Sequence, residues 1–305
     1  MASAAGRTSA LILLAAISLS ACSSSEPSGS ASTDGLSIIA TTTMLGNVVG
    51  DLTTCADGEV ITLIPGGADP HDFSPSSQQV AALVRADIVI ANGLGLEGGL
   101  VDALKSAQSD GATVYEVAPE ISPLDFTGTT TPDPHFWFDM SRMAHAVELI
   151  GDQLAAKGGA KYKSCATTQA ARIRSAEQQV KATLASVPAS KRVLVTDHDA
   201  FGYLAHAYGY SIAGAVIPSG TTLAEPSTAD LAALAKTIRS KGVSAIFTNT
   251  NSPKALANAV AGEVGYPVSV VDLYVDSLGP VGSSADSYIG YMQTDAERIA
   301  TALRR

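Results

Sequence analysis

The sequence predicts an α/β protein of two lobes that one long helix joins. Two observations predict this class. Short runs rich in Val, Ile and Thr alternate with alanine-rich segments of helical pattern, which is typical of parallel sheets covered by helices on both faces. In addition, about 270 residues follow Gly35, more than one hydrophobic core usually holds, and this length favours two cores.

Each half of the chain contains four candidate strands. They are rich in β-branched residues and are separated by helical patterns, so each half predicts a four-stranded, mainly parallel sheet flanked by helices. The predicted strands are residues 37–43, 60–64, 87–91 and 113–117 in the first half, and 192–196, 211–216, 245–249 and 268–273 in the second.

A long helix is predicted between the two halves. Residues 166–187 contain no glycine or proline and are rich in strong helix formers. Their apolar residues form only a thin stripe, so we expect this helix to lie on the surface and to join the lobes as a rigid rod. The resulting division is an N-terminal lobe at 36–160, a linking helix at 161–187 and a C-terminal lobe at 188–305.

The N-terminus indicates export and lipid anchoring. The apolar run from Leu11 to Leu19, about nine residues, is too short to span a bilayer. The following Leu-Ser-Ala-Cys at 19–22 resembles a bacterial lipobox, so we expect residues 1–21 to be a signal peptide and Cys22 to carry lipid. The alternative is a plain secretory signal with an incidental cysteine. Residues 22–35 are serine-rich and predict a disordered tether, which would hold the protein at the outer face of the cell membrane.

Charge and cysteine content narrow the chemistry further. The formal net charge of −10 argues against nucleic acid as a partner. Once Cys22 is lipidated, Cys55 and Cys165 remain as a pair in an extracytoplasmic protein, where disulfides persist. We therefore predict a Cys55–Cys165 disulfide; soft-metal ligation is the weaker alternative, because neither cysteine has a close partner cysteine.

The tripeptide Asp-Pro-His occurs twice, ending at His71 and at His135, in a chain with five histidines. Proline stiffens each turn, and the upstream aspartate offers an acceptor for the imidazole, as a divalent metal site requires. His198 follows the first strand of the second lobe, and Asp276 lies just beyond its last strand. All four positions follow the carboxyl ends of predicted strands, where open α/β sheets place their ligands.

Several longer segments carry a family resemblance. At residues 67–76, 133–139, 198–209, 224–227 and 273–279 the chain resembles the metal-binding solute-binding proteins of zinc and manganese ABC transporters (bacterial solute-binding protein family 9, ZnuA/TroA-like lipoproteins). The resemblance implies two Rossmann-like lobes with a metal cleft between them and His71, His135, His198 and Asp276 as metal ligands. It also implies a monomeric receptor, not an enzyme, that delivers a divalent ion to a cognate ABC permease.

The donor set favours zinc, with manganese as the alternative. Three imidazoles and one carboxylate suit tetrahedral zinc, and nitrogen and oxygen ligands bind zinc more tightly than manganese. Some members of the family have glutamate at the third position, a choice associated with manganese, whereas this chain has His198. The long His-rich loop of many zinc importers is absent from residues 122–132.

Other functions remain open from the sequence. Three histidines with an open metal position would suit a zinc hydrolase, although no His-Glu-x-x-His is present. An adhesin with a structural metal and a siderophore or haem receptor are further alternatives. We expect small lobe motions, with the loop around Asp276 moving when the ion is released.

Other histidines, aromatic residues and aspartates of the chain have different expected roles. We interpret His145 and His206 as ordinary helix residues and the aromatic residues 136–138 as packing residues. Three aspartates either orient the imidazole rings or cap turns and helix starts, namely Asp69, Asp133 and Asp199.

Overall fold

The computed structural model describes residues 35–304, which contain two four-stranded sheets with all strands parallel. The predicted signal peptide, Cys22 and nearly all of the tether lie outside the described residues. The predicted α/β class is confirmed, and the observed strand ends lie within three residues of the predicted ones. The first sheet has the order β2-β1-β3-β4 and consists of β1 (Ile38–Ala40), β2 (Val60–Thr62), β3 (Ile88–Ala91) and β4 (Thr113–Glu116). The second has the order β6-β5-β7-β8 and consists of β5 (Val193–Thr196), β6 (Ser211–Ala215), β7 (Ala245–Asn249) and β8 (Ser269–Leu273).

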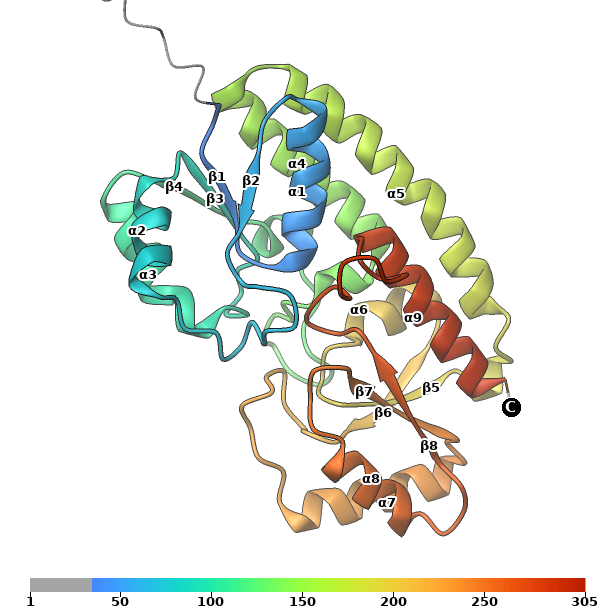
Figure 1. The fold of residues 1–305 in the computed structure, drawn as a ribbon. Helices are drawn as coiled ribbons and strands as arrows, with labels where there is room; N and C mark the ends of the chain where they lie inside the picture. Colours follow the sequence, from blue (N-terminus) through green and yellow to red (C-terminus); the bar gives the residue numbers. More distant parts are fainter. Residues whose placement is uncertain (1–34, 305) are drawn as a thin grey trace, which may run out of the picture. The chain divides into compact units, whose positions relative to one another are not determined.

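Helices connect the strands and cover the sheets (Figure 1). No helix among residues 35–304 is long and apolar enough to cross a membrane. In the first lobe the helices are α1 (Thr43–Cys55), α2 (Ser77–Arg85), α3 (Val101–Ser109) and α4 (Met140–Gly158). They are followed by α5 (Lys161–Ala185), α6 (Gly202–Tyr208), α7 (Thr228–Lys241), α8 (Ala255–Glu263) and α9 (Tyr288–Leu303).

The central strands are buried on both faces, which explains their continuous apolar composition. Successive side chains of a strand point to opposite faces. In β1, Ile38 packs into the core with α1 and α4, whereas its neighbour Ile39 packs into a separate core with α2 and α3. The second sheet repeats this arrangement, with α6 and α9 on one face and α7 and α8 on the other.

Both sheets have a topological switch point at their centre. Strand order reverses between β1 and β3 in the first sheet and between β5 and β7 in the second. The connections from the two central strands leave toward opposite faces there, so a crevice opens beyond the carboxyl ends of the strands. The loops that carry the candidate ligands start at these ends.

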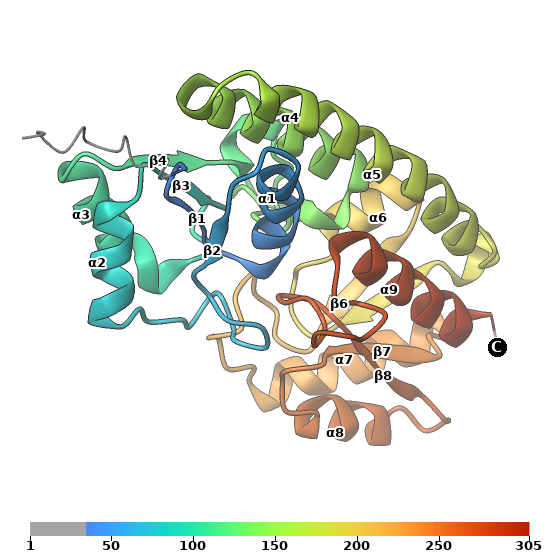
Figure 2. The ribbon, with the colours of Figure 1, turned by 45° about the horizontal axis from the view of Figure 1, so that its top comes forward.

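Helix α5 begins and ends within the predicted linking range of 161–187. It packs along α4 and also contacts α1 and α9, so it touches helices before and after it in the chain (Figures 1 and 2). A Cβ added at Gly151 of α4 would lie 2.2 Å from Cβ of Ala166, so these two helices approach closely only because Gly151 has no side chain. The linking helix is thus part of the core as well as a connection.

A disulfide fixes α1 to α5. Cys55, the last residue of α1, is bonded to Cys165 in the second turn of α5, across a sequence separation of 110 residues. The predicted pairing is confirmed. The closed loop contains three of the four strands of the first sheet, β2, β3 and β4, so the bond restricts the unfolded chain over more than a third of its length.

Candidate metal centre

His71 lies in the long loop after β2, in the first Asp-Pro-His turn. Oδ1 of Asp69 accepts the backbone N–H of His71 at 2.9 Å, and Pro70 restricts the turn between them. The imidazole is 5% exposed, and its Nε2 has no hydrogen-bond partner among the described residues. A buried ring nitrogen without a partner is costly, so this atom is suited to receive a cation.

His135 repeats the same turn in the loop after β4. Oδ1 of Asp133 accepts the backbone N–H of His135 at 2.9 Å and also lies 2.7 Å from its Nδ1. Because an ionised carboxylate oxygen can only accept, the ring nitrogen facing it then carries the proton, and Nε2 is left with its lone pair toward the site. Nδ2 of Asn92, which follows β3, donates to the carbonyl of Pro134 at 3.0 Å and fixes the turn from behind.

His198 follows β5 by two residues, next to the switch point of the second sheet. Oγ1 of Thr196 donates to the carbonyl of His198 at 2.8 Å and holds its backbone. Oδ2 of Asp197 lies 3.6 Å from Nδ1 of the ring, so the carboxylate attracts that side of the imidazole. Nε2 therefore faces the other histidines.

Asp276 lies three residues beyond β8 and is 3% exposed. Nδ2 of Asn249, the last residue of β7, donates to its Oδ2 at 2.8 Å. The other oxygen, Oδ1, has no hydrogen-bond partner among the described residues and lies 3.7 Å from Nε2 of His198. One oxygen is thus held by the protein while the other remains available to a ligand.

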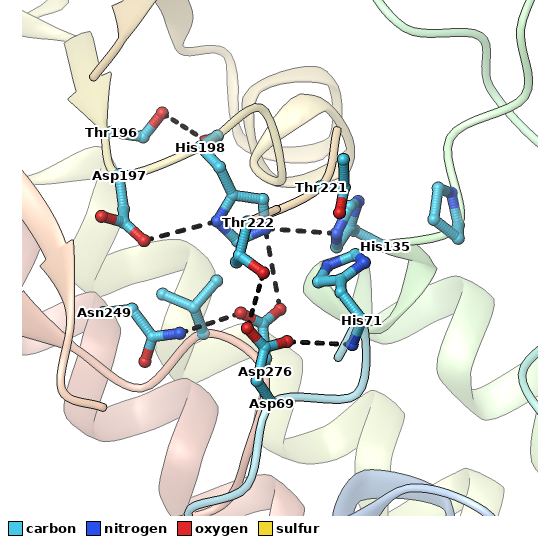
Figure 3. A network of polar contacts seen from close by, with 12 residues as sticks. Asp69, His71, His135, Thr196, Asp197, His198, Thr221, Thr222, Asn249 and Asp276 are labelled. Carbon is cyan, nitrogen blue, oxygen red and sulfur yellow. Dashed lines mark hydrogen bonds and ion pairs between the residues drawn. The ribbon is translucent and has the colours of Figure 1, made fainter. Parts of the chain in front are cut away.

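These four side chains converge, although they come from both sheets (Figure 3). One nitrogen or oxygen atom from each lies within 4.8 Å of the corresponding atoms of the others. Nε2 of His135 and Nε2 of His198 are 3.4 Å apart. An edge of a tetrahedron is about 1.6 times its centre-to-corner length, so zinc–nitrogen bonds of about 2.0–2.1 Å give edges of about 3.3 Å. The arrangement could hold one small divalent cation.

Electrostatics keep two of the rings neutral. Burial first, and then repulsion from His135 and His198, lower the pKa of His71 to about 3. Burial, together with the charge of His198, also lowers the pKa of His135 well below its usual value. Neutral imidazole is the form that binds metals, so both rings are ready to act as ligands over the physiological pH range.

The other two ligand candidates, His198 and Asp276, influence each other through their charges. Burial lowers the pKa of His198, but the carboxylates of Asp276 and Asp197 outweigh this effect and the net pKa is raised. Burial raises the pKa of Asp276 to about 6, against the attraction of His198. A cation binding between them would replace the proton on His198, so binding should release protons.

The structure shows which of the neighbouring aspartates contact a histidine ring. Asp133 contacts an imidazole, whereas the bonds of Asp69 within the described part of the chain go to the backbone of His71 and, through its Oδ2, to Thr222. Asp199 makes no contact with the ring of His198 among residues 35–304; Asp197 does. Sequence reasoning did not assign a role to Asp197 or to Asn249, although a polar residue at the end of a central strand is a usable signal.

The remaining candidates behave as ordinary structural residues. His145 on α4 and His206 on α6 are exposed, and His145 lies 3.8 Å from Glu148 on its own helix. Trp137 is buried behind His135, with 5.2 Å between their ring centroids, and its Nε1 donates to the carbonyl of Val275 at 3.1 Å. The aromatic residues therefore support the site from behind.

Comparison with known proteins gives one consistent answer. Residues 38–302 match the family ZnuA, described as zinc-uptake complex component A, periplasmic. Zinc-binding protein TroA of Treponema pallidum is 29% identical over 287 residues, which are 90% of this chain and 91% of TroA. The solved structure of TroA superposes with a TM-score of 0.82 at 26% identity, covering 89% of this chain and all of TroA.

Other relatives are named for other metals. Manganese-binding lipoprotein MntA of Halalkalibacterium halodurans is 25% identical over 96% of this chain and 97% of its own. Iron ABC transporter substrate-binding lipoprotein MtsA of Streptococcus pyogenes is 26% identical over 98% of this chain and all of its own. With a family match that spans nearly every described residue, the chain belongs to the ZnuA family of metal-binding solute-binding proteins of ABC transporters (bacterial solute-binding protein family 9), whose members are not enzymes.

Proposed function

We propose that this protein is a monomeric, lipid-anchored receptor outside the cytoplasm that binds one divalent transition-metal ion and delivers it to a cognate ABC permease. The ligands in this proposal are His71, His135, His198 and Asp276. The observation that carries it is their geometry: one donor atom from each side chain lies within 4.8 Å of the others, and all four side chains are buried. The family consists of binding proteins, so the zinc-hydrolase alternative is dropped.

Zinc is the metal we favour. The 3.4 Å between Nε2 of His135 and Nε2 of His198 agrees with an edge of a zinc tetrahedron. Nitrogen donors also bind zinc more tightly than manganese, as the order of divalent metal affinities requires. Manganese is the second candidate, since a carboxylate that binds through both oxygens would raise the coordination number, which manganese tolerates better.

The anchor in this proposal is Cys22, at the end of the lipobox-like sequence. The names of the relatives support it, because MntA and MtsA are both called lipoproteins. A lipid on Cys22 would keep the receptor near its permease while residues 22–35 allow it to reach the transporter. Labelling with a radioactive fatty acid tests this: wild type should incorporate label, and Cys22→Ala should not.

Metal content tests the central claim. Protein purified from its own host should contain one transition-metal ion per chain by elemental analysis, and His198→Ala should contain little. His206→Ala is the matched control, because His206 is an exposed histidine of the same lobe and should leave the metal content unchanged. Equal metal content in His198→Ala and wild type would refute the proposed site, and a competition between zinc and manganese on stripped protein would settle the preference.

A further inference from the structure

The segment between β6 and α7 crosses the candidate site without supplying a ligand. We call residues 217–223 the strap. None of its residues is buried, and Leu223 is 58% exposed. A cavity of about 320 Å³ is lined in part by Ile217 and Thr222, and another of about 380 Å³ is lined in part by residues 218–221 and by His71. The strap therefore borders space into which it can move.

One part of the strap is tied to the segment that carries His198. The backbone N–H of Ile217 donates to the carbonyl of Asp197 at 2.8 Å, and the carbonyl of Ser219 accepts the N–H of Asp199 at 2.8 Å. His198 lies between these two bonds. A displacement of the strap would therefore be transmitted to His198.

The other part of the strap reaches the first lobe. Oγ1 of Thr222 donates to Oδ2 of Asp69 at 2.6 Å, while Oδ1 of the same carboxylate holds the backbone of His71 (Figure 3). Gly220 lies against Phe126, so closely that a Cβ added there would come within 2.1 Å of the ring. Thr222 is thus the residue through which the strap bonds the turn that presents His71.

The loop around Asp276 is held far more firmly. Its backbone and side chains bond the first lobe at three places: Leu278 N–H to Thr43 Oγ1 at 2.9 Å, Gly67 N–H to Ser277 Oγ at 2.9 Å, and Trp137 Nε1 to the carbonyl of Val275 at 3.1 Å. Residues 275–277 are all buried. These contacts argue against our expectation that this loop is the one that moves on release.

We propose that Thr222 is the closure latch of the site: its hydroxyl bond to Asp69 holds the strap across the bound ion and slows the ion's escape. This inference rests on the proposed metal site. Thr222 is a positioning residue that acts through Asp69 and the turn of His71, and it does not touch the ion. Breaking the bond lets the strap move into the neighbouring cavities and opens a path beside His71.

The test is the dissociation rate of zinc, measured by stopped flow after mixing loaded protein with excess chelator. Thr222→Val keeps the shape of the side chain and removes the hydroxyl. A hydrogen bond to a charged carboxylate is strong, but Thr222 is only half-buried and water can replace part of it, so we expect dissociation about fivefold faster. The association rate and the melting temperature of the metal-free protein should stay unchanged, which a general loss of structure would not allow.

Two further variants make the test specific. Thr222→Ser restores the hydroxyl and should dissociate at nearly the wild-type rate. Thr221→Val removes the neighbouring hydroxyl, which among residues 35–304 accepts the N–H of Leu223 within the strap and bonds no group of the first lobe, and should have little effect. The latch is refuted if Thr222→Val dissociates like wild type, if Thr222→Ser is as fast as Thr222→Val, or if Thr221→Val is equally fast. Failure of the proposed function would look different, because wild-type protein would then bind no zinc.

Discussion

One oxygen of Asp133 holds both the backbone and the ring of His135. Burial raises the pKa of this carboxyl to about 7, so its ionised form is unfavourable in the metal-free protein. A cation bound to the other side of the imidazole would stabilise that ionised form. Because the carboxylate orients the ring and makes it a stronger donor, Asp133→Asn should weaken zinc binding about 10- to 100-fold while the fold is preserved. Competition with a chromophoric chelator measures this affinity.

Asp199 provides the matched control for Asp133. It adjoins His198 in sequence, but its carboxylate does not contact the ring of that histidine among the described residues. We expect Asp199→Asn to change zinc affinity less than about threefold. Equal losses in the two variants would mean that the total negative charge near the site matters and that the orientation of His135 does not.

Asp295 on α9 predicts how stability depends on pH. It is 1% exposed, and burial raises its pKa well above 3.8, against the backbone N–H of Tyr274 and the charge of Arg298. A raised pKa means that the folded state holds the proton more tightly than the unfolded state. The stabilisation is therefore complete below about pH 4 and is lost as pH rises through the folded-state pKa.

Asp295→Asn should remove this pH dependence. The amide oxygen can still accept the N–H of Tyr274, but the side chain cannot ionise. In urea unfolding of metal-free protein, the variant should lose less stability than wild type between about pH 4 and pH 8, by about 1–2 kcal/mol. Asp110→Asn, at an exposed position, should follow the wild-type curve. A steeper decline in Asp295→Asn than in wild type would contradict the sign.

At the scale of residues, the repeated Asp-Pro-His could be read from the sequence because its chemistry is local. Each aspartate bonds the backbone two residues on, so the bond that defines both turns lies within the motif itself. The partner of His198 could not be read in this way. Asp197 and Asp199 flank it symmetrically, and only the bend of the chain after β5 decides which carboxylate faces the ring.

At the scale of elements, the bond between α1 and α5 has a large expected effect. Replacing both Cys55 and Cys165 by alanine frees a loop of 110 residues in the unfolded state. We expect the free energy of unfolding of metal-free protein to fall by about 3–5 kcal/mol, measured with urea. Zinc affinity should stay within about twofold, because neither cysteine contacts the site.

Chemical reduction provides the control for that variant. A thiol reductant should destabilise wild-type protein by a similar amount and leave the double variant unchanged. Reduction that destabilises both proteins equally would show that the loss comes from another effect of the reductant. A double variant as stable as wild type would show that the unfolded chain gains little freedom.

The strands were predictable because buried parallel strands are continuously apolar, as β3 and the first three residues of β7 show. The ends of the strands were harder to predict. The strand predicted at 37–43 ends at Ala40 in the structure, because Thr42 caps α1 by accepting the N–H of Leu45. Helix α5 begins five residues before the predicted Ala166, at Lys161. No proline or glycine separates these residues from the helix, so nothing in the sequence stops it there.

At the scale of the whole molecule, the two sheets share one apolar core. It contains Ile38 and Ile90 of the first sheet, Leu194 and Phe247 of the second, and the aromatic residues of α9 between them. The described chain forms one compact unit by its contacts. The sequence predicted two lobes joined by a rigid helix, but it did not predict this shared core. The periodicity of apolar residues shows that a helix has an apolar face, but it does not show which other element that face packs against.

This shared core limits how far the protein can open. Besides α5, two buried tyrosines cross between the parts: Tyr288 OH donates to the carbonyl of Trp137 at 2.7 Å, and Tyr203 OH donates to that of Asp133 at 2.9 Å. We therefore expect metal binding to change the radius of gyration by less than about 1 Å in small-angle X-ray scattering, far less than a hinge closure produces. Zinc should nevertheless raise the melting temperature, and further with each increase in its concentration, because it binds only the folded state. A contraction of several ångströms on adding zinc would mean that the shared core separates in the metal-free protein, and the strap alone could not then account for release.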